Sequence, residues 1–147
     1  KLCDRSDCFL FVTTTTSTAH ALLVKRFGHC VRIWIGYFPF DFYFFITNAL
    51  CRVRPDLIVL FESELWPELL HCARANKIPV WLANARHSDK TMSRFSRFPW
   101  IARWLYACVA KAMFVSAKQA NDLASLSIVA NSAKVLGQLK LDVSLPV

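Results

Sequence analysis

Two carboxylates, Glu62 and Glu64, follow a short apolar run and stand just before Trp66 and Pro67. The run, residues 57–61, has the length of a strand that is buried on both faces, and Pro67 suits the first turn of a following helix. Both acids are therefore predicted in a loop at the carboxyl end of a parallel strand, the edge at which open α/β sheets bind ligands. In that position the two acids form a candidate acid–base couple. The alternative is helix capping, because acids ahead of a helix interact favourably with its dipole.

A second polar group, Asn84, Arg86 and Ser88, follows the next predicted strand at residues 78–83. The carboxyl ends of neighbouring parallel strands meet at one edge of a sheet, so this group is expected beside the two acids. Arg86 can hold a phosphate or a carboxylate through two hydrogen bonds, or it can simply pair with Glu62. The sequence thus predicts a polar cluster at one sheet edge and leaves both roles of Arg86 open.

Residues 13–18 read Thr-Thr-Thr-Thr-Ser-Thr. Hydroxyl groups such as those of Thr16 and Thr18, together with the N–H groups at the start of a helix, can bind an anionic phosphate. The alternative is the end of a strand followed by an ordinary helix N-cap. Both interpretations place this run at the carboxyl end of a strand.

The sequence gives little support for a metal site or a catalytic triad. The six cysteines include no CxxC pair, and no histidine lies at zinc-finger spacing from a cysteine pair, so no metal site is predicted. His87 is interpreted as a bystander, because nothing near it resembles a catalytic triad or a metal shell.

The 147 residues carry a formal net charge of +8, which favours an anionic partner such as a nucleic acid, an acidic membrane or a phosphorylated substrate. Nothing resembles a nucleic-acid-binding motif, so no nucleic acid is expected. Residues 94–105 mix arginines with large aromatic residues, a combination typical of an anionic membrane interface. The alternative is a core helix with arginines on its outer face. The cluster from Tyr37 to Phe45 either adds to this membrane surface or belongs to the core.

Predicted strands and helices alternate along the chain. The strands are expected at residues 8–12, 31–35, 57–61, 78–83, 111–115 and 135–136, and the helices at 18–27, 41–53, 67–76, 100–110 and 117–126. This alternation predicts a Rossmann-like, doubly wound α/β domain with a parallel sheet. Asp41 is expected to cap the second helix.

Several short motifs occur together in a fixed order. They are Val12 to Thr18, Phe38-Pro39-Phe40-Asp41, Glu62-Ser63-Glu64-Leu65-Trp66-Pro67, Ile78-Pro79-Val80, Asn84-Ala85-Arg86 with Ser88, and Gly137-Gln138-Leu139-Lys140-Leu141-Asp142. In this order and spacing they resemble 3-deoxy-D-manno-octulosonic acid (Kdo) transferases of the lipid IV-A type. The resemblance implies the N-terminal half of a GT-B glycosyltransferase that transfers Kdo from CMP-Kdo to a lipid A precursor in lipopolysaccharide core biosynthesis.

The resemblance also implies how the chain is organised and where it works. Residues 1–147 are expected to be the acceptor-binding domain, incomplete at its N-terminus, without the C-terminal donor domain and inactive alone. The implied enzyme inverts the sugar's configuration and needs no cofactor beyond the donor substrate CMP-Kdo. Its implied partners are the lipid A precursor, the anionic membrane surface and the missing donor domain. The implied location is peripheral, on the cytoplasmic face of the bacterial inner membrane.

By the same resemblance, Glu64 and Lys140 are the catalytic candidates, as transition-state stabilisers, while the base lies outside the chain. The implied acceptor-binding residues are Thr16, Thr18, Glu62, Asn84, Arg86 and Ser88. Two alternatives stay open: a GT-B transferase for another glycolipid, and a non-catalytic basic module on a membrane surface.

Overall fold

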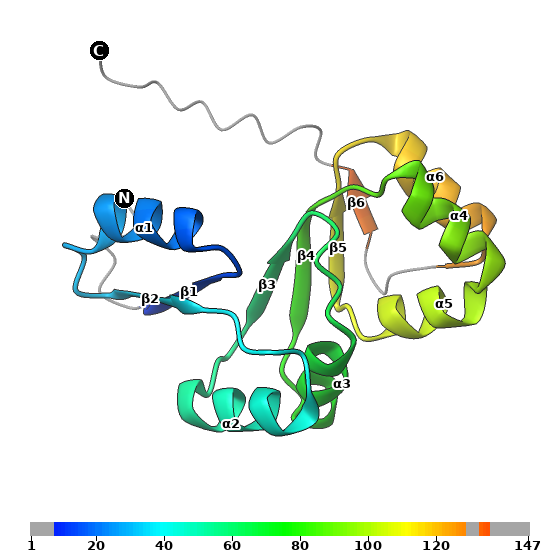
Figure 1. Cartoon of the computed structure of the whole chain (residues 1–147). Coiled ribbons are helices and arrows are strands. Elements are labelled where there is room, and N and C mark those ends of the chain that lie inside the picture. The colour runs from blue at the N-terminus through cyan, green and yellow to red at the C-terminus, as the bar shows by residue number, and fades with distance from the viewer. Residues whose placement is uncertain (1–7, 129–132, 136–147) are drawn as a thin grey trace, which may run out of the picture.

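The computed structural model describes residues 8–128 and 133–135 and shows an alternation of strands and helices (Figure 1). The elements are β1 (Leu10–Thr14), α1 (Ser17–Phe27), β2 (Ile33–Tyr37), α2 (Tyr43–Val53), β3 (Ile58–Phe61), α3 (Pro67–Ala75), β4 (Val80–Ala85), α4 (Asp89–Arg97), α5 (Pro99–Ala107), β5 (Lys111–Phe114), α6 (Ala117–Ser125) and β6 (Ala133–Val135). Among the described residues, no helix is both long and apolar enough to span a bilayer.

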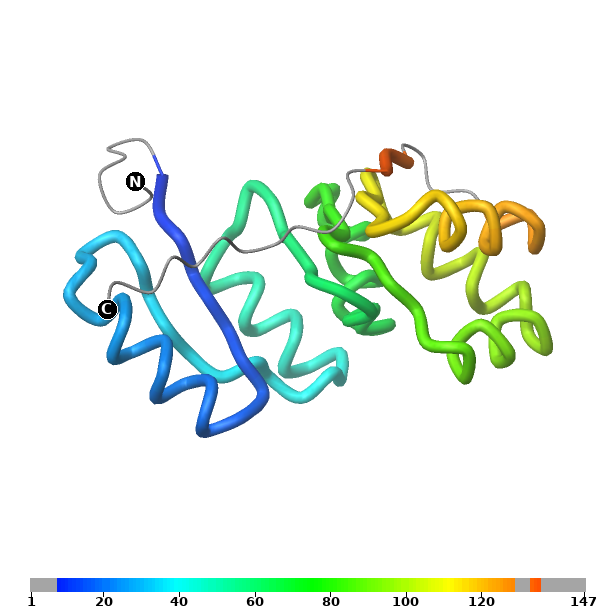
Figure 2. Tube along the Cα trace, turned by 90° about the horizontal axis from the view of Figure 1, so that it is seen from above, coloured from blue at the N-terminus to red at the C-terminus, as the bar shows by residue number. Residues whose placement is uncertain are grey.

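The predicted α/β class is confirmed, and every strand pair is parallel. The strands do not form one sheet, however. Within the described residues, β1 pairs only with β2, and a second sheet has the order β3-β4-β5-β6. Seen from above, β1 lies between β2 and β3 (Figure 2). Within these residues the parallel strands thus form two ladders, because no backbone ladder joins β1 to β3.

The hydrophobic core is built around the four-stranded sheet. Leu60, Leu82 and Ala112 bring three of its strands into one buried cluster with residues of α2, α3, α5 and α6. The unit of β1, α1 and β2 adds little to this core. Helix α1 has no buried residue, and Cys30 and Ile33 are the buried hydrophobic residues between residues 8 and 37. Among the described residues, the four-stranded sheet and its helices are thus well packed, whereas the β1–α1–β2 unit has few buried residues.

Helix α2 does not begin as predicted. Its N-cap is Phe42, without a side-chain cap. Asp41 instead accepts hydrogen bonds from the backbone N–H groups of Glu68 (3.1 Å) and Leu69 (2.9 Å) at the start of α3. A carboxylate at this end of a helix satisfies free N–H groups and complements the helix dipole. Asp41 therefore caps a helix distant in sequence and ties the segment after β2 to the start of α3.

Candidate active site

The acidic loop, residues 62–66, connects β3 to α3 and is shaped by backbone hydrogen bonds. The N–H of Glu62 donates to the carbonyl of Ala83 on β4 (2.9 Å), and the N–H of Glu64 donates to the carbonyl of Phe61 (3.3 Å). Glu62 has a φ of 60°, in the left-handed region that costs a residue with a side chain about 1 kcal/mol or more. The loop therefore turns sharply at the edge of the sheet, as the sequence predicts.

A second left-handed residue lies beside this turn. Asn84 has a φ of 54°, and the register between β4 and β5 shifts between Leu82 and Ala85. An irregularity of this kind re-aims the side chains that follow it. Two neighbouring strands thus both leave regular geometry at their carboxyl ends, which meet at the upper edge of the sheet in Figure 1.

Arg86 and Glu62 form an ion pair across these two strand ends. The guanidinium Nη2 lies 2.7 Å from the carboxylate Oε1, and the side chains are 58% and 46% exposed. The structure therefore shows the pairing that was one of the two interpretations of Arg86. A pair this exposed contributes little stability, about 1 kcal/mol or less, so its main effect is to hold Arg86 beside the acidic loop.

Glu64 differs from Glu62 in its surroundings. Its side chain is exposed, and within the described part of the chain its carboxylate has no hydrogen bond or ion pair. The two acids are thus unequal: an arginine compensates the charge of Glu62, whereas the charge of Glu64 faces solvent next to the start of α3.

Two predicted hydroxyl ligands act as helix caps. The hydroxyl of Thr16 accepts a hydrogen bond from the N–H of Ala19 (3.3 Å) at the start of α1. The hydroxyl of Ser88 accepts one from the N–H of Thr91 (3.2 Å) at the start of α4. Thr18 is exposed in the first turn of α1. These residues lie at the same ends of their strands as the acidic loop. The capping interpretation of residues 13–18 describes the contact of Thr16, and Ser88 caps α4 in the same way.

Lys140 lies outside the described residues, so its predicted place beside Glu64 stays a prediction. No group of three or more metal-ligating side chains occurs among the described residues. The structure also has a shallow depression of about 310 Å³ between α4 and α6, lined by Met92, Ser93, Ser96, Asp122, Ser125 and Leu126. None of the predicted site residues lines it.

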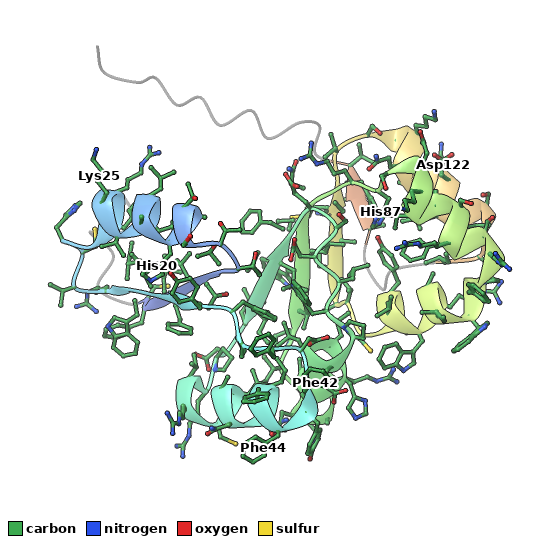
Figure 3. All side chains as sticks on the ribbon, viewed as in Figure 1. His20, Lys25, Phe42, Phe44, His87 and Asp122 are labelled. Atoms are coloured by element: carbon green, nitrogen blue, oxygen red, sulfur yellow. The ribbon has the colours of Figure 1, made fainter. Side chains whose placement is uncertain are left out.

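His87 is a buried structural residue, and the prediction that it takes no part in a triad or a metal site stays a prediction. Its side chain is only 7% exposed, its Nε2 shares a hydrogen bond with the hydroxyl of Tyr106, and Gln119 donates to its carbonyl oxygen (3.3 Å). Phe95 lies edge-on to the imidazole, with the ring centroids 5.3 Å apart. Burial lowers the pKa of His87 to about 4, so the ring is neutral at pH 7. Figure 3 marks His87 beside α4, at the end of the sheet.

The burial of His87 fixes the segment that carries two of the predicted site residues. From Ala85 to Ser88 the side chains alternate between buried and exposed, so anchoring His87 turns Arg86 and Ser88 outward. The sequence around His87 does not predict this burial, because its partners Tyr106 and Gln119 come from later elements.

Residues 1–143 match the model of one protein family, described as 3-deoxy-D-manno-octulosonic-acid transferase (Kdo transferase). The chain belongs to this family. The match takes in both the acidic loop and the segment from Asn84 to Ser88, so the family resemblance drawn from the motifs is confirmed.

Individual Kdo transferases show the same likeness. The chain is 33% identical to the 3-deoxy-D-manno-octulosonic acid transferase of Bordetella pertussis over 141 residues, which cover 93% of this chain and 32% of the relative. It is 26% identical to the enzyme of the same name from Haemophilus influenzae, over 90% of this chain and 30% of the relative. A bifunctional glycosyltransferase/methyltransferase from Fusobacterium nucleatum is 25% identical over 92% of this chain and 21% of its own length. The chain thus spans about a third or less of these relatives.

Proposed function

We propose that this chain supplies the acceptor half of an inverting GT-B glycosyltransferase that transfers Kdo from CMP-Kdo to a lipid A precursor. The proposal combines membership of the Kdo transferase family with the position of the acidic loop. That loop lies at the carboxyl edge of a parallel sheet, where α/β proteins bind ligands. The residues at this edge then have separate roles in the reaction.

The difference between Glu62 and Glu64 is the observation that carries the proposal. Transfer of a sugar develops positive charge on the sugar ring while the phosphate leaves, and an aligned carboxylate stabilises that charge. Glu62 is compensated by Arg86 at 2.7 Å, whereas the carboxylate of Glu64 is exposed and unpaired among the described residues. Glu64 is therefore the stabilising carboxylate, and Glu62 positions Arg86.

Cations and hydroxyls at the same edge serve the anionic parts of the substrates. Arg86 uses one guanidinium nitrogen to pair with Glu62, and a guanidinium has further N–H donors for a phosphate or carboxylate. Lys140 would offset negative charge on the departing phosphate or the Kdo carboxylate. The start of α1, next to Thr16 and Thr18, would receive an acceptor phosphate. Asn84 and Ser88 would bind acceptor hydroxyls.

The test uses the longer parent enzyme with its donor half, CMP-Kdo and a lipid A precursor. Glu64→Gln should lower kcat by about a hundredfold, the usual effect of losing one transition-state stabiliser, with a smaller change in the KM for the acceptor. The matched control is Asp56→Asn, an exposed acid before the amino end of β3, which should leave kcat unchanged. Wild-type turnover by the Glu64→Gln enzyme would remove Glu64 from the mechanism.

The identity of the acceptor is tested separately from the role of Glu64. Replacing the lipid A precursor with other glycolipids under the same conditions distinguishes Kdo transfer to lipid A from transfer to another glycolipid. The isolated 147 residues should show no transfer in this assay, because they span about a third of the Kdo transferases that they match. Measurable transfer by the isolated chain would overturn the assignment of the chain as an acceptor half.

A membrane surface is the second part of the proposal, and exposed aromatic residues favour it. Five aromatic residues at the start of α2 have side chains between 48% and 75% exposed: Phe40, Phe42, Tyr43, Phe44 and Phe45. Figure 3 marks Phe42 and Phe44 within this group. So many exposed rings in one place are typical of a surface that contacts a partner or a membrane, and a peripheral site at the inner membrane suits a lipid acceptor.

Helix α5 contributes less than the sequence predicts. Ala102, Leu105 and Tyr106 face the core, while Trp100 is 68% exposed. The side chain of Arg103 also contacts the protein, because its guanidinium donates a hydrogen bond to the carbonyl of Leu126 (3.1 Å). The segment thus combines both interpretations, a core face and an exposed aromatic face.

The membrane surface is tested with vesicles that contain anionic lipid. Replacing Phe42 and Phe44 with serine should weaken binding of the chain at least about tenfold, because each exposed ring loses about 1.5 kcal/mol or more of transfer free energy. The control replaces Leu22 and Val24, which are exposed on α1, in the same way. Equal binding by the wild-type and Phe42/Phe44 variants would reject this surface.

A further inference from the structure

The segment of residues 38–41 leads from the end of β2 towards α2 and passes beside the start of α3 (Figure 1). The proposed roles of the site residues make no use of this segment. Its backbone is held at one end, because the N–H of Phe38 donates to the carbonyl of Thr14 at the end of β1 (2.9 Å). Pro39 fixes a further backbone torsion. The segment is thus a short, restrained connection that starts at the carboxyl end of β1.

Asp41, at the far end of this segment, supplies the cap that α3 would otherwise lack. The residue at the N-cap position of α3 is Trp66, whose side chain makes no cap hydrogen bond. The second and third residues of the helix, Glu68 and Leu69, instead donate their N–H groups to the two carboxylate oxygens of Asp41. These are the N–H groups that an N-cap side chain normally binds. Asp41 therefore holds the start of α3, directly after the acidic loop.

Phe38 makes a second contact with the end of the acidic loop. Its ring stacks on that of Trp66, the last residue of the loop, with the ring centroids 4.8 Å apart and an angle of 28° between the planes. Both side chains, and that of Leu65, pack against the hydrophobic core. Aromatic pairs prefer defined geometries, so this contact restricts the direction in which the loop enters α3.

The acidic loop is thereby held at both ends. At its first residue, the N–H of Glu62 donates to the carbonyl of Ala83 on β4 (2.9 Å). At its last residue, Trp66 is held by the 38–41 segment. Glu64 lies midway between these two anchors, and within the described residues its carboxylate has no hydrogen bond or ion pair that would orient it. The position of this carboxylate therefore depends on where the two anchors place the loop backbone.

We propose that Asp41 and Phe38 are positioning residues, which place Glu64 for the reaction by holding the end of the acidic loop. The inference rests on the proposed function, because it takes Glu64 as the carboxylate that stabilises the transition state. The same segment bonds to the end of β1, just before Thr16, so it also sets the separation between the start of α1 and Glu64. A misplacement of about 1 Å can cost about a hundredfold in rate, so loss of this anchor should be visible in kcat.

The first test is a double-mutant cycle in the longer parent enzyme, with CMP-Kdo and a lipid A precursor as substrates. Asp41→Ala alone should lower kcat by about tenfold or more, with a smaller change in the KM for the acceptor. In the Glu64→Gln enzyme the same substitution should lower kcat by less than about twofold, because the effects of residues that act through one another are not additive. Asp41→Asn keeps the shape of the side chain and one acceptor oxygen, so it should retain more of kcat than Asp41→Ala. Phe38→Leu, which removes the stacked ring but stays apolar, should give the same non-additive pattern with Glu64→Gln.

The matched control is Asn76→Ala, at the opposite end of α3. The side chain of Asn76 donates to the carbonyl of Cys72 (2.8 Å), so this substitution also removes a side-chain hydrogen bond from a terminus of the same helix. It should lower the Tm but leave kcat within about twofold of the wild-type value. A loss of kcat as large as that of Asp41→Ala would show that any weakening of α3 slows turnover, and it would overturn the proposal.

Amide hydrogen exchange in the 147-residue chain measures the loop without reference to turnover. The N–H groups of Glu64 and Leu65 both donate to carbonyls within or next to the loop. Their exchange should be faster by about tenfold or more in the Asp41→Ala and Phe38→Leu proteins than in the wild type, and unchanged in Asn76→Ala. Wild-type exchange rates in the first two proteins would show that the segment does not hold the loop, which overturns the proposal.

The combined results separate this inference from the proposed function. Wild-type turnover by the Glu64→Gln enzyme would reject the role of Glu64 and the positioning inference with it. Reduced turnover by Glu64→Gln together with an additive cycle would reject only the positioning by Asp41. If Asp41→Ala does not fold, Asp41→Asn and Phe38→Leu take its place in the same cycle, and full turnover by both would reject the inference.

Discussion

Replacing His87 with glutamine should remove an acid-sensitive part of the free energy of unfolding. The imidazole is buried against Tyr106 and Phe95, and burial lowers its pKa from 6.5 to about 4. In the unfolded chain the imidazole takes up a proton near its ordinary pKa, whereas in the folded protein it stays neutral until about pH 4. The free energy of unfolding therefore has its full value above about pH 6.5, and it decreases as the pH drops towards 4.

The size of the effect follows from the two pKa values. Between about pH 7.5 and about pH 5 the shift corresponds to a loss of about 2 kcal/mol, and the full shift corresponds to about 3 kcal/mol. Glutamine cannot take up a proton in this range, and its amide can still reach the hydroxyl of Tyr106 in place of Nε2. The His87→Gln variant should thus be less stable at neutral pH but lose about 2 kcal/mol less than the wild type on acidification.

The assay is urea unfolding, followed by circular dichroism at both pH values. Carboxylates also titrate on acidification, and the difference between wild type and variant cancels their contribution. The control is His71→Gln, an exposed histidine on α3. If wild type and His87→Gln lose the same free energy on acidification, or if His71→Gln reproduces the effect, the argument from the burial of His87 is wrong.

Three further predictions each concern a single side chain. Asp41→Ala should lower the free energy of unfolding by about 1–2 kcal/mol, because α3 loses the acceptor of two N–H groups; Asp56→Ala, at an exposed acid, is the control in the same urea titration, and equal losses would contradict the cap. Cys72 should react with iodoacetamide far more slowly than the exposed Cys51, since burial raises the pKa of its thiol to about 11; mass spectrometry of the native chain measures both sites, and similar rates would show that Cys72 is accessible. In the parent enzyme, Lys140→Ala should lower kcat by about a hundredfold with little change in acceptor KM, and unchanged turnover in a steady-state assay would exclude Lys140 from the chemistry.

Local patterns in the sequence predict the elements well, and contacts between distant segments explain where they fail. The apolar run before Glu62 and the proline at position 67 are enough to place the acidic loop between β3 and α3. Asp41 shows the limit: a carboxylate just before a predicted helix reads as its cap, yet the backbone brings the start of α3 closer, and the acid caps that helix instead. Helix α4 was missed because its residues are mostly polar, although Ser88 and Asp89 form a suitable start.

In the candidate site, too, local patterns predict some features and contacts between distant segments determine the others. The sequence predicts that Glu62, Glu64 and Arg86 share one sheet edge, since parallel strands end together, and the ion pair of Glu62 with Arg86 was one of two foreseen outcomes. It does not predict which acid is left unpaired, because that depends on the left-handed turn at Glu62. Nor does it predict the burial of His87, which depends on Tyr106 and Gln119 arriving from later elements.

The uneven distribution of the core has a consequence for how the molecule loses its structure. Nearly all the buried residues belong to β3 and the elements after it, and helix α1 has none. Segments with few buried contacts open at a lower free energy than segments that are packed into the core. The β1–α1–β2 unit should therefore unfold first, as one cooperative unit, while the four-stranded sheet keeps its structure. Two of the six predicted acceptor-binding residues, Thr16 and Thr18, belong to the unit that opens first.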